Sequence, residues 1–314
     1  MQKVLTALGS LGGKPIEFLT PEQARQQPTP ANAVKVVLRN EGMSTAPMPV
    51  AGIVNMKIPG PAGPIPIRVY TPAGSGPFPV LVYFHGGGWV IAGLNTYDSS
   101  ARALANAAGY VVVSVAYRQA PENKFPAAAQ DAYAATRWAM KNASKINGEP
   151  RTVAVAGESA GGNLATVVAL MARDKHQQMP IYQVLVYPVT NYAFDTASYR
   201  ENVHAKPLNR AMMQWFWKYY LPDSAAGANP YASPLRAKSL SGLPPATIIA
   251  AQIDPLLTEG RRYADRLRDA GIRVHYREFY GVTHEFFGMG AVVDEAKAAV
   301  SFAATDLHNA AGGR

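Results

Sequence analysis

Five short, continuous apolar runs constrain the fold of this chain more strongly than any other feature. Runs of this kind suit strands that are buried on both faces, as in a parallel sheet, and not strands with one solvated face. Longer stretches with helical periodicity lie between them, so strand and helix alternate along the chain. The runs are PVLVYF, YVVVSVAY, RTVAVAG, YQVLVY and ATIIAAQ.

The sequence therefore predicts an α/β fold with a mostly parallel, eight-stranded sheet flanked by helices. Two further segments, GIVNMKI and IPIRVYTP, alternate in polarity and have flanking prolines, which favours an antiparallel edge of that sheet. Ligands of such sheets bind beyond the carboxyl ends of the strands, so functional residues are expected in the loops that follow them. The predicted strands are 53–58, 65–70, 79–84, 110–116, 152–156, 183–187, 246–251 and 272–279, and the predicted helices are 97–108, 126–146, 160–174, 257–270 and 291–309.

Two segments interrupt this alternation. Residues 1–50 are cut by prolines into short helical pieces, and residues 189–240 contain the aromatic stretch MMQWFWKYYLP. We expect both to form a helical cap over the strand ends of a catalytic domain made of residues 51–188 and 241–314. Ordinary packing of the aromatic stretch against the body of the protein is the alternative, and both can hold together.

Composition excludes several classes of function. The chain has 314 residues and no cysteine, so disulfides, thiolate metal ligands and a cysteine nucleophile are excluded. Its net charge of +9 comes from dispersed basic residues and not from a basic stripe with stacking aromatics, so nucleic acid is not an expected partner. We find no convincing signal-peptide core and no long apolar run, which predicts a cytoplasmic protein without stable membrane insertion.

The segment GESAGGN, residues 157–163, joins a buried strand to a helical pattern. A strand, a sharp glycine-rich turn with a serine at its tip and an immediate helix make a nucleophile elbow. Ser159 is then the candidate nucleophile, and the helix that starts at Ala160 points backbone N–H groups toward the serine oxygen. A plain glycine-rich turn between strand and helix is the alternative.

A serine nucleophile needs a base within reach and a carboxylate that orients the base. Of the six histidines, His284 in GVTHEFFG follows the last predicted strand. Asp254 follows the strand before it, although its role could equally be that of a helix N-cap. The order Ser159, Asp254, His284 is that of an α/β-hydrolase triad, and Asp195 and Glu259 are weaker candidates for the carboxylate.

The HGGG segment, residues 85–88, ends another apolar run. Glycine loses the most backbone freedom on folding, so three in a row are costly unless the backbone must approach something closely. Acyl transfer places negative charge on a carbonyl oxygen, which preorganised backbone N–H groups stabilise. The segment therefore predicts an oxyanion hole formed by the N–H groups of Gly87, Gly88 and Ala160.

From about residue 15 to its end the chain resembles the hormone-sensitive-lipase-like branch of the α/β-hydrolases, and in particular its bacterial carboxylesterases. The segments that carry the resemblance are LTPEQAR, VYFHGGGWV, VAYRQAPENKFPAA, GESAGGN, DPLLTEG and GVTHEFFGM. The resemblance implies Ser159 as nucleophile, His284 as general base and Asp254 as its orienting carboxylate. It also implies the cap described above, a loop-shaping role for His85, and allows a homodimer.

Two positions depart from the usual pattern of that branch. Glu158 stands before the serine where aspartate is usual, and Gln119 replaces a usual leucine. The first change keeps the charge and is expected to alter local hydrogen bonds, and the second is not expected to touch the chemistry.

The sequence thus predicts a serine carboxylesterase that acts on small-molecule esters of short to medium acyl chains and needs no cofactor and no metal. The motifs of metalloproteases, dinucleotide-binding proteins and P-loop proteins are absent from the sequence. Two other hypotheses stay open: a non-catalytic binding protein that keeps the fold, and a hydrolase whose natural target is an amide, carbamate or lactone. The aromatic residues of 189–240, with Trp89 and Tyr187, are candidate walls of the substrate pocket.

Overall fold

A computed structural model describes residues 1–312 of the chain, and its centre is one eight-stranded sheet. The strand order is β1-β2-β4-β3-β5-β6-β7-β8. β1 and β2 pair antiparallel, as do β2 and β4, and every later pairing is parallel. The strands are β1 Gly52–Ile58, β2 Ile65–Thr71, β3 Phe78–Phe84, β4 Val111–Val115, β5 Gly148–Glu158, β6 Gln183–Val186, β7 Ala246–Ile253 and β8 Val274–Thr283.

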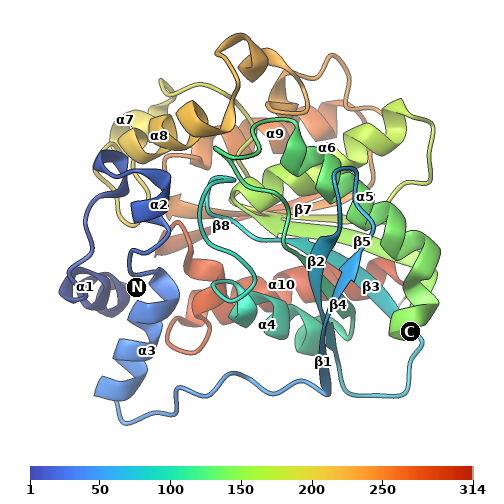
Figure 1. Cartoon of the computed structure of the whole chain (residues 1–314), viewed down its shortest axis with the longest axis horizontal. Coiled ribbons are helices and arrows are strands. Elements are labelled where there is room, and N and C mark those ends of the chain that lie inside the picture. The colour runs from blue at the N-terminus through green and yellow to red at the C-terminus, as the bar shows by residue number, and fades with distance from the viewer. Residues whose placement is uncertain (313–314) are drawn as a thin grey trace.

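Helices cover both faces of the sheet, as its doubly buried strands require (Figure 1). α4 and α10 pack together on one face, whereas α5, α6 and α9 pack on the other. The bounds of these helices are α4 Asp98–Ala108, α5 Ala127–Asn142, α6 Ala160–Asp174, α9 Leu257–Asp269 and α10 Asp294–Ala310.

The core is divided into two layers by the alternation of side chains along each strand. In β3, Val80 and Val82 belong to the layer shared with α5 and α6, whereas Leu81 and Tyr83 belong to the layer shared with α4 and α10. All four side chains are fully buried. This burial on both faces explains why the central strands read as continuous apolar runs.

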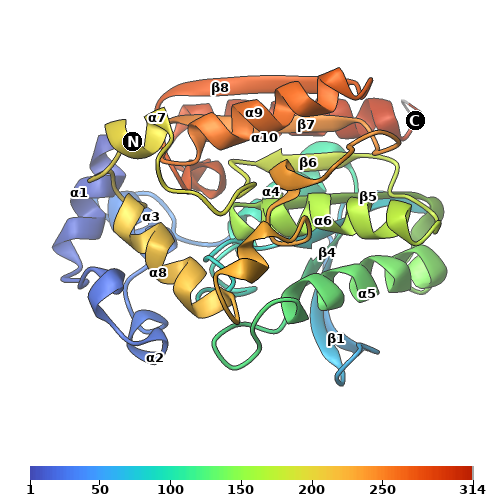
Figure 2. The ribbon, with the colours of Figure 1, turned by 90° about the horizontal axis from the view of Figure 1, so that it is seen from above.

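Two segments lie outside the layers of the sheet and its covering helices. Residues 1–50 contain α1 Gln2–Ser10, the turn η1 Ile16–Phe18, α2 Pro21–Ala24 and α3 Pro30–Asn40. Residues 189–240 contain α7 Ala197–Glu201, α8 Arg210–Tyr220, η3 Ala225–Ala228 and η4 Pro234–Arg236. Both views place α1–α3 and α7–α8 at the same end of the molecule (Figures 1 and 2).

Side-chain hydrogen bonds tie these two segments to each other and to the sheet. Trp215 of α8 donates its indole N–H to the carbonyl of Leu19 at 2.9 Å, and Asn209 donates to Glu17 at 3.2 Å. Arg25, the last residue of LTPEQAR, donates to the carbonyl of Val90 at 2.9 Å, directly beyond the HGGG segment. The first segment is therefore fastened to the loop that follows β3.

The predicted α/β fold is confirmed, with all eight strands and all five predicted helices near their expected positions. The antiparallel placement of the first two strands is also confirmed. The bounds differ most at β5 and β8: β5 begins at Gly148, because that residue already pairs with Phe78 of β3, and β8 runs on to Thr283. The predicted helix 126–146 ends at Asn142 and continues as the turn η2 Ala143–Ile146.

None of the helices in residues 1–312 combines the length and the apolar character that crossing a membrane requires.

We expect Val82→Ala to lower the free energy of unfolding by about 2 kcal/mol, because it removes two methyl groups from a fully packed site. Val54→Ala is the matched control, since Val54 lies on the edge strand β1 and is 57% exposed, whereas Val82 is 0% exposed. Thermal unfolding followed by circular dichroism measures both variants. Equal midpoints for the two variants would contradict the buried position of Val82.

Candidate active site

Ser159 occupies a strained turn between β5 and α6. β5 ends at Glu158 and α6 begins at Ala160, which leaves Ser159 alone between them with φ 56° and ψ −117°. A positive φ is uncommon for a residue with a side chain and marks local strain. The Ser159 N–H donates to the carbonyl of Val186 in the neighbouring strand β6 at 2.9 Å, which holds the turn in place.

The glycines around Ser159 are required by close backbone contacts. A Cβ atom on Gly161 would lie 1.9 Å from the carbonyl oxygen of Phe84, at the end of β3. A Cβ atom on Gly157 would lie 2.2 Å from the carbonyl oxygen of Gly161. Real Cβ atoms do not approach other atoms so closely, so the sharp turn needs glycine at both positions.

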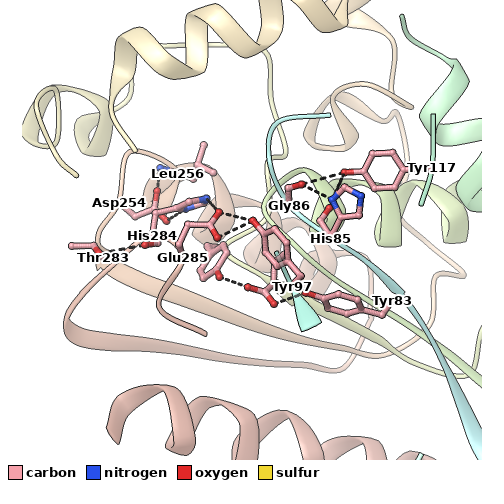
Figure 3. Close-up of polar contacts among 12 residues, drawn as sticks. Tyr83, His85, Gly86, Tyr97, Tyr117, Asp254, Leu256, Thr283, His284 and Glu285 are labelled. Atoms are coloured by element: carbon pink, nitrogen blue, oxygen red, sulfur yellow. Dashed lines mark hydrogen bonds and ion pairs between the residues drawn. The ribbon is translucent and has the colours of Figure 1, made fainter. Parts of the chain in front are cut away.

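His284 and Asp254 meet at the carboxyl ends of the last two strands. β8 ends at Thr283 and β7 ends at Ile253, so each residue directly follows its strand. His284 Nδ1 donates to Asp254 Oδ2 at 2.7 Å, and both side chains are buried (Figure 3). A neutral His284 with its proton on Nδ1 therefore presents an unprotonated Nε2.

Asp254 also stabilises the backbone before α9, but it is not the N-cap of that helix. Its Oδ1 accepts the N–H of Leu256 at 2.8 Å, and Leu256 is the N-cap of α9, which begins at Leu257. One carboxylate oxygen thus fixes the loop before α9 and the other holds His284, so the N-cap role that the sequence left open for Asp254 is wrong.

Three charged neighbours determine the protonation of His284. Burial alone lowers the pKa of the imidazole, because the charged form loses its hydration. The carboxylates of Asp254, Glu285 and Glu158 outweigh burial, so the pKa of His284 is raised above its ordinary value. The surroundings therefore favour the imidazolium that forms when the ring accepts a proton.

A cavity of about 360 Å³ brings the predicted residues together. Ser159, His284, Gly87 and Gly88 all line it, and Phe216 of α8 adds an apolar wall. Among the hydrogen bonds of residues 1–312, none joins Ser159 to His284. Such bonds are often long in structures without substrate and shorten only in the reacting complex.

The HGGG segment takes a conformation that only glycine adopts easily. Gly87 has φ 94° and Gly88 has φ 57°, and a Cβ atom on Gly88 would lie 2.1 Å from the ring of Phe216. The N–H groups of Gly87, Gly88 and Ala160 have no acceptor within the described part of the chain. They are free to bind an oxyanion beside Ser159.

His85 supports the HGGG segment itself, and Gln119 supports the residues that follow it. The His85 ring stacks on Tyr117 at 4.4 Å between centroids, and its Nδ1 bonds to the carbonyl of Gly86 at 2.8 Å. Burial lowers the pKa of His85 to about 4, so the ring is neutral at physiological pH and holds the loop. Gln119 donates to the carbonyls of Ile91 and Ala92 at 2.8 and 3.2 Å.

Two glutamates and several tyrosines form a network around the site, and the sequence did not predict most of it. Glu158 is fully buried, whereas the side chain of Glu285 is 19% exposed. Glu158 accepts hydrogen bonds from Tyr83 at 2.5 Å and from Tyr187. Glu285 accepts from the Tyr97 hydroxyl at 2.7 and 2.8 Å (Figure 3). Burial and the charge of Glu285 raise the pKa of Glu158 to about 7. The sequence signals that could have indicated this network are Glu158, directly before Ser159, and Glu285, directly after His284.

The remaining candidate residues lie away from this centre. Asp195 belongs to the exposed stretch before α7. Glu259 is buried in α9 and accepts the N–H of Thr190 at 2.6 Å, so it stabilises the start of the 189–240 segment. Burial raises its pKa to about 8. His275 is half-exposed and bonds to Asp306 at 2.8 Å on a distant part of the surface.

Of the residues predicted to form the walls of the substrate pocket, Phe216 lines the cavity, whereas Trp89 and Tyr187 do not. Trp89 is fully buried and stacks on Tyr220 of α8 at 4.0 Å. Tyr187 packs against His284 with its ring centroid 4.4 Å away and does not line the cavity. No cluster of three or more potential metal-ligating side chains lies within residues 1–312.

Comparison with known proteins places the chain in a family. A family model described as alpha/beta hydrolase fold matches residues 81–288. The carboxylic ester hydrolase LipN of Mycobacterium tuberculosis is 45% identical over 243 residues, which are 76% of this chain and 65% of the relative, just under two thirds of its length. The esterase LipI of the same organism is 39% identical over 81% of this chain and 80% of its own. The solved esterase of Pyrobaculum calidifontis has a TM-score of 0.87 and 38% identity, covering 98% of this chain and 97% of its own.

The chain therefore belongs to the α/β-hydrolase fold family, in the hormone-sensitive-lipase-like branch that its motifs indicate. It is an enzyme of the carboxylic ester hydrolase class.

We expect Gly161→Ala to lower both the thermal midpoint and the esterase activity, because the new methyl group would force the end of β3 away from α6. Gly93→Ala is the matched control, since a Cβ atom there meets nothing within 4 Å. Unfolding and turnover are measured on both proteins. An unchanged Gly161→Ala enzyme would contradict the close contact at the turn.

Proposed function

We propose that this protein is a serine carboxylesterase in which Ser159 is the nucleophile, His284 the general base and Asp254 the carboxylate that orients it. The observation that carries the proposal is the 2.7 Å bond between His284 and Asp254, at the edge of the cavity that Ser159 also lines. The strained turn supports the same role, because it places Ser159 at the start of α6, where it lines the cavity.

In the proposed reaction the Ser159 oxygen attacks the ester carbonyl while Nε2 of His284 takes its proton. The tetrahedral intermediate collapses, and the imidazolium returns that proton to the departing alcohol. His284 then removes a proton from water, which attacks the acyl-enzyme. The second tetrahedral intermediate releases the acid while the imidazolium returns the proton to the Ser159 oxygen. Asp254 keeps the ring in the tautomer that leaves Nε2 free.

The negative charge of the intermediate would be held by the N–H groups of Gly87, Gly88 and Ala160. Their lack of another acceptor among the described residues supports this role, since no internal bond has to break when the oxyanion forms. Removing one donor of this kind typically costs a factor of about 10² to 10³ in rate.

Residues 1–50 and 189–240 would act as the cap over this site. Both segments contribute lining residues to the cavity, among them Ile16, Leu208 and Phe216. Their mutual hydrogen bonds would let them move or stay closed as one unit. The cavity volume of about 360 Å³ favours esters with short to medium acyl chains.

The two other hypotheses make different predictions for the same site. A binding protein would have no need of the bond between His284 and Asp254, which fixes a base and not a ligand. A hydrolase of amides, carbamates or lactones would use the same three residues, so relative turnover of matched substrates decides between them.

The homodimer and the cytoplasmic location stay predictions.

We expect Ser159→Ala to reduce the hydrolysis of p-nitrophenyl esters by at least about 10³-fold, because a triad without its nucleophile keeps only binding and the oxyanion hole. Ser301→Ala on the exposed face of α10 is the matched control and should hydrolyse them as the wild type does. The measurement covers acetate to decanoate esters. Equal rates for Ser159→Ala and the wild type would overturn the proposal.

A further inference from the structure

Glu285 stands beside the proposed catalytic base, on the side opposite Asp254. It directly follows His284 and has φ 71°, a left-handed conformation that turns its side chain back toward the ring. Its Oε1 lies 3.7 Å from Nε2 of His284, while Asp254 is bonded to Nδ1 (Figure 3). The imidazole therefore lies between two carboxylates.

The distance of 3.7 Å decides what Glu285 can do. It is too long for a hydrogen bond, so Glu285 does not occupy the place that the Ser159 proton needs. It is short enough for a strong charge interaction in a buried site, where a carboxylate within 4–6 Å favours the charged form of its partner. Glu285 can thus stabilise an imidazolium without taking its proton.

Tyr97 keeps Glu285 at this distance. Its hydroxyl donates to the carboxylate, with contacts of 2.7 Å to Oε1 and 2.8 Å to Oε2, and its own side chain is buried. Tyr97 is the N-cap of α4, in the connection that follows β3, so the position of Glu285 is fixed from a distant part of the chain. A carboxylate left free at this site could instead swing onto Nε2 and block the base.

We propose that Glu285 is a positioning residue of the reaction, whose charge stabilises the imidazolium of His284 between proton uptake from Ser159 and proton return to the leaving alcohol. This inference rests on the triad proposed above.

Several other groups face this pair and contribute to its titration. Burial raises the pKa of Glu285, while His284 and the Tyr97 hydroxyl lower it in part. Burial and the charge of Glu285 raise the pKa of Glu158 to about 7, so it titrates within the pH range of the experiment below. The titratable groups packed around the ring and Glu285 are Asp254, Glu158, Tyr83, Tyr97 and Tyr187.

The experiment compares Glu285→Gln, which removes the charge, with Glu285→Asp, which keeps it. The readout is kcat/KM for p-nitrophenyl butyrate from about pH 5 to pH 9, the range in which a histidine base loses its proton. In Glu285→Gln the pKa of His284 falls, so we expect the acid limb to move to lower pH by about one unit. The plateau rate should fall up to about tenfold through kcat with KM unchanged, since one pKa unit is a factor of ten in imidazolium stability.

Glu285→Asp keeps the charge, so its acid limb and its plateau rate should both lie close to those of the wild type. Glu295→Gln on the exposed face of α10 is the matched control and should leave the profile unchanged. Glu158→Gln shows how much of the acid limb of the wild-type pH profile comes from the titration of Glu158. Thermal midpoints of all variants separate loss of fold from loss of charge.

The outcomes distinguish this inference from the proposed function. If Ser159→Ala keeps the wild-type rate, the triad itself is wrong. If Ser159→Ala is inactive but Glu285→Gln is folded and keeps the wild-type acid limb, only the role of Glu285 is overturned. An NMR titration of His284 in the inactive Ser159→Ala protein gives the same pKa comparison without turnover, and an equal pKa with and without the Glu285 charge would also overturn it.

Discussion

The close contact between the end of β3 and the first turn of α6 is the constraint on which the rest of the site depends. Gly161 lies so near the carbonyl of Phe84 that no side chain fits between them. This contact lets the chain reverse from β5 into α6 within one residue, and that residue is Ser159. The same contact brings the HGGG segment, which follows Phe84, beside the N-terminus of α6. One close backbone contact thus positions both the proposed nucleophile and the proposed oxyanion donors.

The acidic groups around this backbone need compensation, because a buried carboxylate is costly unless hydrogen bonds or charges satisfy it. Asp254 is satisfied by His284 and by the backbone N–H of Leu256. Glu158 and Glu285 are satisfied by tyrosine hydroxyls, which support a charge without supplying an opposite one. The three carboxylates therefore favour the charged form of His284, which suits a mechanism that passes through a positively charged histidine.

The fold was predictable because burial on both faces leaves an unambiguous apolar pattern in the central strands. The loops after β5, β7 and β8 were predictable as the place of the chemistry, since parallel strands end at one edge of the sheet. Tyr97 and its bond to Glu285 were not predictable, because the two residues come from distant parts of the chain and no local pattern pairs them. Trp89 was expected at the cavity wall, but it is fully buried against α8, where it stacks on Tyr220.

The central claim is that Ser159 is activated by the bonded pair of His284 and Asp254. Mass spectrometry after treatment with an alkyl phosphonate ester that carries a good leaving group tests it most directly, because such a probe reports the nucleophile without any choice of substrate. We expect one phosphonate adduct per chain, located on Ser159, with labelling strongly slowed in Asp254→Asn. Labelling at another residue, or no labelling of a folded and active protein, would contradict it.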